Sequence, residues 1–294
     1  MKQPSAIFLG FLCLGLFSCN DDEVTPITIL VADTVGPEIK ILSPQANDSI
    51  LVVDVVEIQA NVRDDKRLEH VQLVLEAPDG GRRILSDVTI SPYDNFKNYR
   101  ISEFYRIPKH TALGNYFIMV EAKDMALNTT KSIVTFKFHA SDLNYAAFLK
   151  PFSNAFVNST YFESLDWFGY NFEHGFAFDD VWLSILLNLM ISSDNDYSIS
   201  EAEWMKFIND FGFKNQDWMN WDQDNDGNLN DKEFYEGLKS LNIFVDWDKN
   251  KDNLVNKEEL AAGIFERWDD NQDGILNKDE YVENFFTYLH RRRK

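Results

Sequence analysis

Alternating apolar and polar positions dominate the chain from residue 37 to residue 140. The period of two is clearest in four segments, residues 56–63, 71–76, 116–122 and 134–138. Because successive side chains of a strand point to opposite faces, this period predicts strands with one buried face. Pro78-Asp79-Gly80-Gly81 is typical of a hairpin turn between two of these strands. Strand signals at this spacing predict a β-sandwich of about a hundred residues.

Beyond residue 140 the period of two is lost. Residues 141–179 are rich in aromatic side chains, and residues 180–191 form an apolar stretch that predicts a helix. The aromatic segment suits either a core that joins two domains or a platform for a ligand such as a sugar, and we favour the core. Its aromatic residues are Phe148, Phe152, Phe156, Tyr161, Phe162, Trp167, Phe168, Tyr170, Phe172, Phe176 and Phe178.

From residue 222 onward, polar residues recur at a fixed spacing. Three twelve-residue stretches, which begin at Asp222, Asp248 and Asp269, each have Asp first, Asp or Asn third, Asp fifth, an apolar residue eighth and Glu twelfth. Ca²⁺ binds about six to eight hard oxygens, and a curling chain brings the side chains at positions 1, 3 and 5 together. The carbonyl of position 7 and both oxygens of the glutamate complete such a shell.

This spacing resembles the EF-hand family, and the resemblance covers the chain from about residue 179 onward. Each copy follows a Trp, and three copies in register make an incidental acidic tract a poor explanation. The resemblance implies Ca²⁺ ligands in each loop: Asp222, Asp224, Asp226, the Asn228 carbonyl and Glu233 in the first; Asp248, Asn250, Asp252, the Leu254 carbonyl and Glu259 in the second; Asp269, Asn271, Asp273, the Ile275 carbonyl and Glu280 in the third.

Position 6 ranks these loops, because there the chain must turn with a positive φ. Gly227 and Gly274 provide this freedom in the first and third loops, whereas the second loop has Asn253, which tolerates the left-handed region better than most residues. We therefore expect the two loops with glycine to bind best. Only residues 260–268 separate the last two loops, so a single helix should serve both, unlike the familiar EF-hand pair.

A weaker copy of the loop lies upstream. Its ligands would be Ser192, Asp194, Asp196, the Ser198 carbonyl and Glu203. Ser192 replaces the first carboxylate, and Tyr197 stands where glycine is preferred. Holding a bulky residue at positive φ costs on the order of 1–2 kcal/mol. We expect a weak site here, or a vestigial one that still pairs structurally.

The N-terminus has the features of an export signal. The apolar run at residues 6–16 is too short to span a bilayer, so it predicts a signal peptide over residues 1–18. Small or apolar residues lead into Cys19, which resembles the lipobox of bacterial lipoproteins. The resemblance implies a membrane anchor at Cys19 and a tether over residues 19–36. An ordinary secretory signal with an incidental cysteine is the alternative.

The acidic run Asp21-Asp22-Glu23 resembles the export signal of surface lipoproteins in one group of Gram-negative bacteria. It implies a lipid-anchored protein of the outer membrane, exposed at the cell surface. Cys13 lies in the signal peptide and Cys19 would be lipidated, so the mature chain has no disulfide.

The charge balance narrows the classes of partner. The chain has 48 acidic against 28 basic residues, a formal net charge of −20. This argues against nucleic acid, whose phosphates need Lys and Arg, and suits a metal binder. The basic residues 291–294 are explained by a helix C-terminus that positive charge stabilises, and a partner-binding tail is the less favoured reading.

Two motifs resemble the Ig-like domains found near the anchors of bacterial surface proteins. They are Val35-Gly36-Pro37-Glu38-Ile39 and Ala122-Lys123-Asp124-Met125-Ala126-Leu127-Asn128. The resemblance implies a disulfide-free Ig-like sandwich over residues 37–140. Asp64, Asp65 and Asp124 could hold Ca²⁺ at one end of it, although polar turns at strand ends are the more common explanation.

Together these features predict a multidomain chain, in which an all-β Ig-like sandwich and the connector of residues 141–179 precede an all-α EF-hand domain over residues 180–294. We expect a calcium-binding surface protein in which Ca²⁺ is structural and supports adhesion or binding of a protein or glycan partner. An accessory glycan-binding lipoprotein is the alternative, and a calcium-dependent hydrolase is third. The five His are scattered and no glycine-rich phosphate loop is present, so we expect no catalytic residues; only a Glu–Asp pair for glycoside hydrolysis stays open.

Overall fold

The computed structural model describes residues 32–157, 162, 165–177, 181–193 and 197–290. The chain divides into two units, residues 1–34 and residues 35–294, and the described helices and strands all belong to the second unit. The predicted signal peptide and Cys19 lie outside the described residues. Within the described part, no helix has the length and apolar character needed to cross a membrane.

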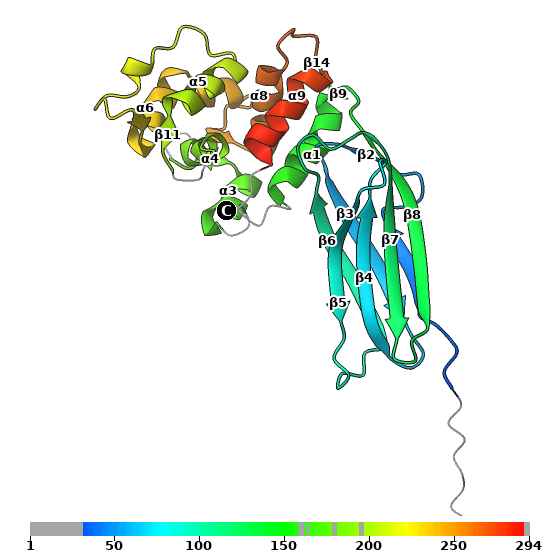
Figure 1. Ribbon diagram of the computed structural model, residues 1–294. Helices are drawn as coiled ribbons and strands as arrows, with labels where there is room; N and C mark the ends of the chain where they lie inside the picture. The colour runs from blue at the N-terminus through cyan, green and yellow to red at the C-terminus, as the bar shows by residue number, and fades with distance from the viewer. Residues whose placement is uncertain (1–31, 158–161, 163–164, 178–180, 194–196, 291–294) are drawn as a thin grey trace, which may run out of the picture. The chain divides into compact units, whose positions relative to one another are not determined.

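Eight of the strands form two sheets, which carry the β-rich region (Figure 1). The three-stranded sheet has the order β1-β3-β6, with β1 at Glu38–Ser43, β3 at Val55–Arg63 and β6 at Asn98–Arg106. The five-stranded sheet has the order β2-β8-β7-β4-β5, with β2 at Ser49–Leu51, β8 at Thr129–His139, β7 at Gly114–Asp124, β4 at Leu68–Glu76 and β5 at Arg82–Thr89. All neighbours are antiparallel except β2 and β8.

The predicted alternation along these strands is confirmed by burial. In β3, Val56 and Ile58 are buried whereas Glu57 between them is exposed. The hairpin turn is confirmed as well: Gly80 has φ 81°, and the Ala77 amide donates to the Gly81 carbonyl at 2.8 Å. Glycine meets no steric penalty at this φ, which explains the turn sequence.

The rest of the described chain contains short strands and helices joined by turns and loops. In chain order they are β9 (Leu143–Asn144), α1 (Tyr145–Val157), α3 (Asp166–His174), β10 (Phe176–Ala177), α4 (Trp182–Ile191), β11 (Ile199–Ser200), α5 (Glu201–Asp210), the 3₁₀ helix η1 (Trp218–Asn220), β12 (Asn228–Leu229), α6 (Asp231–Ser240), α7 (Ile243–Trp247), β13 (Leu254–Val255), α8 (Lys257–Trp268), β14 (Ile275–Leu276), α9 (Lys278–Asn284) and the π-helix η2 (Phe285–Leu289). Helix α8 fills the interval between the second and third loops, so the prediction of one shared helix is confirmed.

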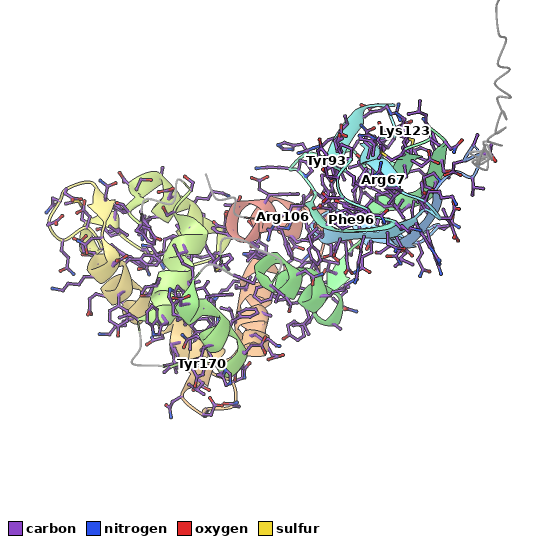
Figure 2. The ribbon with its side chains drawn as sticks, turned by 90° about the horizontal axis from the view of Figure 1, so that it is seen from below. Arg67, Tyr93, Phe96, Arg106, Lys123 and Tyr170 are labelled. Carbon is purple, nitrogen blue, oxygen red and sulfur yellow. The ribbon has the colours of Figure 1, made fainter. Side chains whose placement is uncertain are left out.

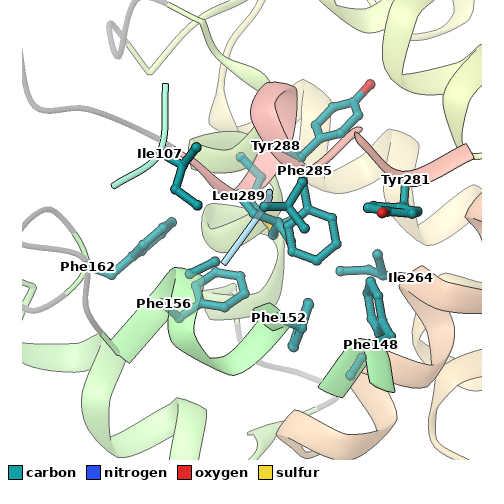
Figure 3. Close-up of a cluster of buried hydrophobic side chains, with 14 of the residues drawn as sticks. Ile107, Phe148, Phe152, Phe156, Phe162, Ile264, Tyr281, Phe285, Tyr288 and Leu289 are labelled. Carbon is teal, nitrogen blue, oxygen red and sulfur yellow. The ribbon is translucent and has the colours of Figure 1, made fainter. Parts of the chain in front are cut away.

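Most of the described aromatic residues of residues 141–179 are core, as predicted, and Figure 3 shows part of this core. Tyr161 and Phe178 lie outside the described residues. Phe148 and Phe152 of α1 are fully buried. The ring of Phe148 makes edge contacts with Trp268 and Phe285, at centroid distances of 5.9 and 5.5 Å. Residues far upstream therefore share one core with the helices beside the third loop. Tyr170 differs, because it is exposed and stacks on His174 at the surface.

Candidate metal centre

The loops at residues 222–233, 248–259 and 269–280, which we call the acidic loops, share one backbone path. Each turns twice through the left-handed region, at positions 4 and 6. The φ values are 57° at Asn225 and 89° at Gly227, 63° at Lys251 and 65° at Asn253, and 58° at Gln272 and 80° at Gly274. Asn253 thus adopts the conformation predicted for it, and the second loop follows the same path as the two loops with glycine.

Hydrogen bonds inside each loop turn its carboxylates inward. In the first loop the Asp222 carboxylate accepts from the Asp226 amide at 3.2 Å and from the Gly227 amide at 3.1 Å. Asp224 and Asp226 accept from the amides two positions after them, at 3.2 and 2.9 Å. The same bonds recur in the other two loops. The backbone thereby orients both oxygens of the aspartate at position 1, and one oxygen of each side chain at positions 3 and 5.

The glutamate at position 12 ties the two ends of the loop together. Glu233 accepts from the Gln223 and Asp224 amides at 2.9 and 3.2 Å through one oxygen, and from the Asn230 amide at 3.1 Å through the other. In the second loop Glu259 makes the equivalent three bonds. Asn230 also caps α6, which explains why a helix begins directly after the loop.

Carboxylate oxygens converge in two of the loops. Asp222, Asp224 and Glu233 each offer an oxygen within 4.8 Å of the others, and Asp248, Asp252 and Glu259 do the same. Two ligands at about 2.4 Å from one Ca²⁺ are at most about 4.8 Å apart, so both groups fit a single ion of that size. Asp222, Glu233 and Glu259 are also buried. Buried carboxylates at such distances repel one another unless a cation lies between them.

The third loop is more open at position 12. Glu280 accepts from the Asn277 amide at 2.8 Å, as its counterparts do. Among the described residues, however, no hydrogen bond joins Glu280 to the amides of residues 270 and 271, the counterparts of those that Glu233 holds. Asp269 is buried and its own bonds match those of Asp222. The predicted order of binding strength stays a prediction.

The Ser192 loop, residues 192–203, is closed by hydroxyl groups at its position 12. Glu203 accepts from the amide and hydroxyl of Ser193 and from the amide and hydroxyl of Ser200. Burial pushes the pKa of the Glu203 carboxyl upward, but these hydrogen bonds outweigh it and hold the pKa below its ordinary value. Tyr197 has φ 62°, as the loop spacing requires. Asp194 and Asp196 lie outside the described residues.

Short antiparallel strand pairs join the loops to partners. Ile199 of the Ser192 loop pairs with Leu229 of the first acidic loop. Val255 of the second pairs with Phe176, and Leu276 of the third pairs with Leu143. Strands β9 and β10 were not predicted, because two residues are too few to show a period. The one available signal is Leu143-Asn144, an apolar residue followed by a helix-capping one, which repeats positions 8 and 9 of the acidic loops.

Gly237 and Gly263, which the sequence pattern did not single out, allow the helix after a loop to pack against the Trp before it. A Cβ on Gly237 would lie 2.1 Å from the Trp221 ring, and a Cβ on Gly263 would lie 2.4 Å from the Trp247 ring. Both tryptophans are buried directly before an acidic loop, and each glycine lies on the helix that follows the loop. The entering and exiting segments therefore touch without an intervening side chain. Glycine at the same distance after the two tryptophans was the signal available in the sequence.

Comparison with solved structures finds similar chains at low sequence identity and low TM-score. No family model matches the sequence, and no curated protein matches it. The fibronectin(III)-like modules of Clostridium thermocellum CbhA are similar over 36% of this chain and 48% of theirs, with 17% identity and a TM-score of 0.24, so this chain spans about half their length. Superoxide reductase from Ignicoccus hospitalis is similar over 36% of this chain and 83% of its own, with 9% identity and a TM-score of 0.28. Murine CRIg is similar over 35% of this chain and 96% of its own, with 9% identity and a TM-score of 0.23. The structural neighbours include fibronectin-III-like and Ig-like proteins. In the described residues of this chain, the N-terminal region is β-rich and a helical part follows it.

Proposed function

We propose that this protein binds Ca²⁺ through EF-hand loops, one ion in each acidic loop. The observation that carries the proposal is the convergence of Asp222, Asp224 and Glu233, repeated by Asp248, Asp252 and Glu259. The donors are carboxylate, amide and carbonyl oxygens, which are the ligands that Ca²⁺ prefers. Bound cations would also offset part of the net charge of −20.

The role that fits these loops is structural. Each cation would join the segment that enters a loop to the helix that leaves it, because Asp222 follows Trp221 and Glu233 lies in the first turn of α6. Helix α8 lies between two such loops, so sites at both ends would hold it. A sensor instead opens a groove rich in Met, and this chain has only six Met in total. We therefore propose that Ca²⁺ rigidifies the helical part.

The proposed setting is the bacterial cell surface. It rests on the sequence alone, through the lipobox-like residues before Cys19 and the acidic run after it. A lipid anchor would hold the protein to the outer membrane, and the calcium-stabilised part would support adhesion or the binding of a protein or glycan partner. Acyl chains contribute about 0.8 kcal/mol for each buried CH₂, so several chains make a firm anchor.

The two other functions gain less support. The glycan-binding alternative relied on the aromatic segment, but Phe148, Phe152 and Phe156 are buried in the core and expose no ring face to a sugar. Among the described aromatic residues of that segment, Tyr170 is the one most open to such a contact. A calcium-dependent hydrolase gains no support from the geometry of the described residues.

Calorimetry on single Glu→Gln variants tests the calcium proposal. Losing one carboxylate oxygen at position 12 should weaken binding at that loop by at least about tenfold, or about 1.4 kcal/mol. We expect the largest losses for Glu233→Gln and Glu280→Gln, a smaller one for Glu259→Gln and the smallest for Glu203→Gln. Glu236→Gln is the matched control, because Glu236 lies on α6 and pairs with Lys239 at the surface. Equal losses for Glu203→Gln and Glu233→Gln would contradict the order.

Metabolic labelling tests the anchor. Cys19→Ser should remove the label of a palmitate analogue and shift the protein to soluble fractions or leave it unprocessed, because the acylated sulfur is lost. Cys13→Ser is the control, since Cys13 lies within the predicted signal peptide. Unchanged labelling of Cys19→Ser would show that the lipobox interpretation is wrong.

A further inference from the structure

The end of the sandwich at which β3 passes to β4 contains buried carboxylates outside the helical part. Asp64 directly follows β3 and is 3% exposed. Asp124 ends β7 opposite Leu68 of β4, and it is fully buried. Buried carboxylates need hydrogen bonds or a cation, because removing a charge from water without compensation is costly. The hydrogen-bond partners of Asp64 and Asp124 therefore decide whether each carboxylate needs a cation.

Asp124 is satisfied by its own turn. One of its oxygens accepts from the Asn128 amide at 2.8 Å, and the other accepts from the Asn128 side-chain nitrogen at 2.7 Å. Both bonds lie within the connection between β7 and β8. For Asp124 the expectation of a polar turn is thus correct, and this residue needs no cation.

Asp64 is only half satisfied. Its Oδ1 accepts from the Lys66 amide at 2.9 Å. Its Oδ2 is buried and has no hydrogen-bond partner among the described residues. The Asp64 amide donates to the Lys97 carbonyl at 2.8 Å, so the backbone holds the residue in place. A buried oxygen without a partner in a native protein points to a bound group.

Asp65 supplies a second ligand at the same place. Its carboxylate and that of Asp64 each have an oxygen within 4.8 Å of the other, which is the spread that two ligands of one Ca²⁺ allow. The nearest cation on the Asp65 side chain is Lys66 Nζ, 3.6 Å from Oδ2, and both side chains are exposed. Such a surface pair contributes about 0–1 kcal/mol, so a divalent ion can displace it. Lys97 Nζ donates to the Asp65 carbonyl, not to its carboxylate.

We propose that Asp64 and Asp65 bind a divalent cation, Ca²⁺ by its preference for hard oxygens, at this end of the β-sandwich. The site is separate from the acidic loops. The turn that contains it is bonded to the loop at residues 91–97 through the Lys97, Phe96 and Pro92 carbonyls. That loop presents Tyr93, which is 96% exposed, and Phe96, which is 53% exposed. Figure 2 views the sandwich from this end and labels both aromatic residues with Arg67. The cation would hold this aromatic surface in one conformation.

Equilibrium dialysis of the full chain with radioactive Ca²⁺ tests this inference. In a background with Glu203→Gln, Glu233→Gln, Glu259→Gln and Glu280→Gln, which replaces the position-12 carboxylate in every loop of the helical part, the chain should still bind calcium at millimolar concentration. Adding Asp64→Asn should lower that uptake by one ion for each chain. Glu103→Gln, an exposed change on β6, is the control and should leave it unchanged.

A second variant keeps the test valid if the combined chain folds poorly. In the otherwise unaltered protein, Asp65→Asn changes an exposed side chain and should reduce total uptake by one ion without loss of folding. Unchanged uptake in both the Asp64→Asn and Asp65→Asn variants would overturn the inference, and it would mean that water satisfies Asp64. The two proposals fail separately, because the proposal for the acidic loops fails only if the loop variants take up as much calcium as the original chain.

Discussion

The acidic loops have two kinds of partner. The first acidic loop pairs with a loop of its own type, through Ile199 and Leu229. The second and third pair with β10 and β9, which belong to the aromatic segment and have no acidic loop around them. Yet the backbone path is the same in all three acidic loops. The ladder between loops therefore requires an apolar residue at position 8 and an extended partner, whereas the ligands belong to each loop alone.

The pairing of the second and third loops with β10 and β9 connects distant parts of the chain. Tyr281 of α9 donates its hydroxyl hydrogen to the Ser141 carbonyl at 3.0 Å, next to the pairing of β9 with β14. Burial raises the pKa of Tyr281 to about 12, with a smaller contribution from Asp142. The segment before the first loop is thus part of the structure that supports the last one. The division of the chain at residue 179 stays a prediction.

Removal of calcium should have the largest effect on the stability of the helical part. It tests whether all the acidic loops depend on a cation, whatever strand each loop pairs with. Chelation should lower the melting temperature and loosen the helices, because the converging carboxylates would repel one another. All seven Trp lie from Trp167 onward, so Trp fluorescence reports the helical part and not the sandwich. An apo form that stays fully folded, with Ca²⁺ inducing dye binding to a newly exposed apolar surface, would contradict the structural role.

Truncation of a buried side chain in β9 or β10 should have the next largest effect. It tests directly whether each pairing supports Ca²⁺ binding in its own loop only. Leu143→Ala and Phe176→Ala each remove a buried side chain, which costs about 2–5 kcal/mol of folding stability. Calorimetry should show weaker Ca²⁺ binding at the third loop for Leu143→Ala and at the second for Phe176→Ala, although neither is a ligand. Val245→Ala, an exposed change on α7 outside the loops, is the control. Equal weakening at all loops would show that pairing is not local.

A methyl group added at Gly237 or Gly263 should have a smaller effect on folding stability. It tests whether the first and second loops share the same packing of Trp on glycine. Gly237→Ala and Gly263→Ala should each lower the stability by about 1–3 kcal/mol, because the methyl would overlap a Trp ring. Gly169→Ala is matched to them, since Gly169 lies within α3 and has open space around it. That change should be neutral or stabilise by up to about 1 kcal/mol. Chemical denaturation measures all three, and equal behaviour would contradict the packing of Trp on glycine.

Local patterns in the sequence were enough to predict much of this structure. The alternation in β3, the left-handed Asn253 and the single helix α8 follow from spacing within one element, and all are observed. The pairing partners β9 and β10 were not predictable in this way, because each is two residues long and its partner lies over 70 positions away. The contact of Gly237 with Trp221 depends likewise on tertiary packing.

The acidic residues teach the same lesson at the level of sites. Spacing identified the acidic loops, because their ligands lie on one short stretch of chain. It placed Asp64 and Asp124 together as strand-end carboxylates, yet the structure separates them: Asp124 is bonded by Asn128, and Asp64 keeps a buried oxygen without a partner among the described residues. The hydrogen bonds of each side chain are what distinguish a carboxylate that stabilises a turn from a carboxylate that is free to bind a cation.

Calcium uptake by the full chain tests the central claim most directly. Equilibrium dialysis should compare the original protein with a variant that combines Glu233→Gln, Glu259→Gln and Glu280→Gln, at equal protein concentration and millimolar calcium. We predict that the variant takes up less calcium than the original protein, because glutamine leaves one ligand oxygen at position 12 where glutamate supplies two. Equal uptake by the two proteins would contradict the account, since it would mean that the acidic loops do not bind Ca²⁺.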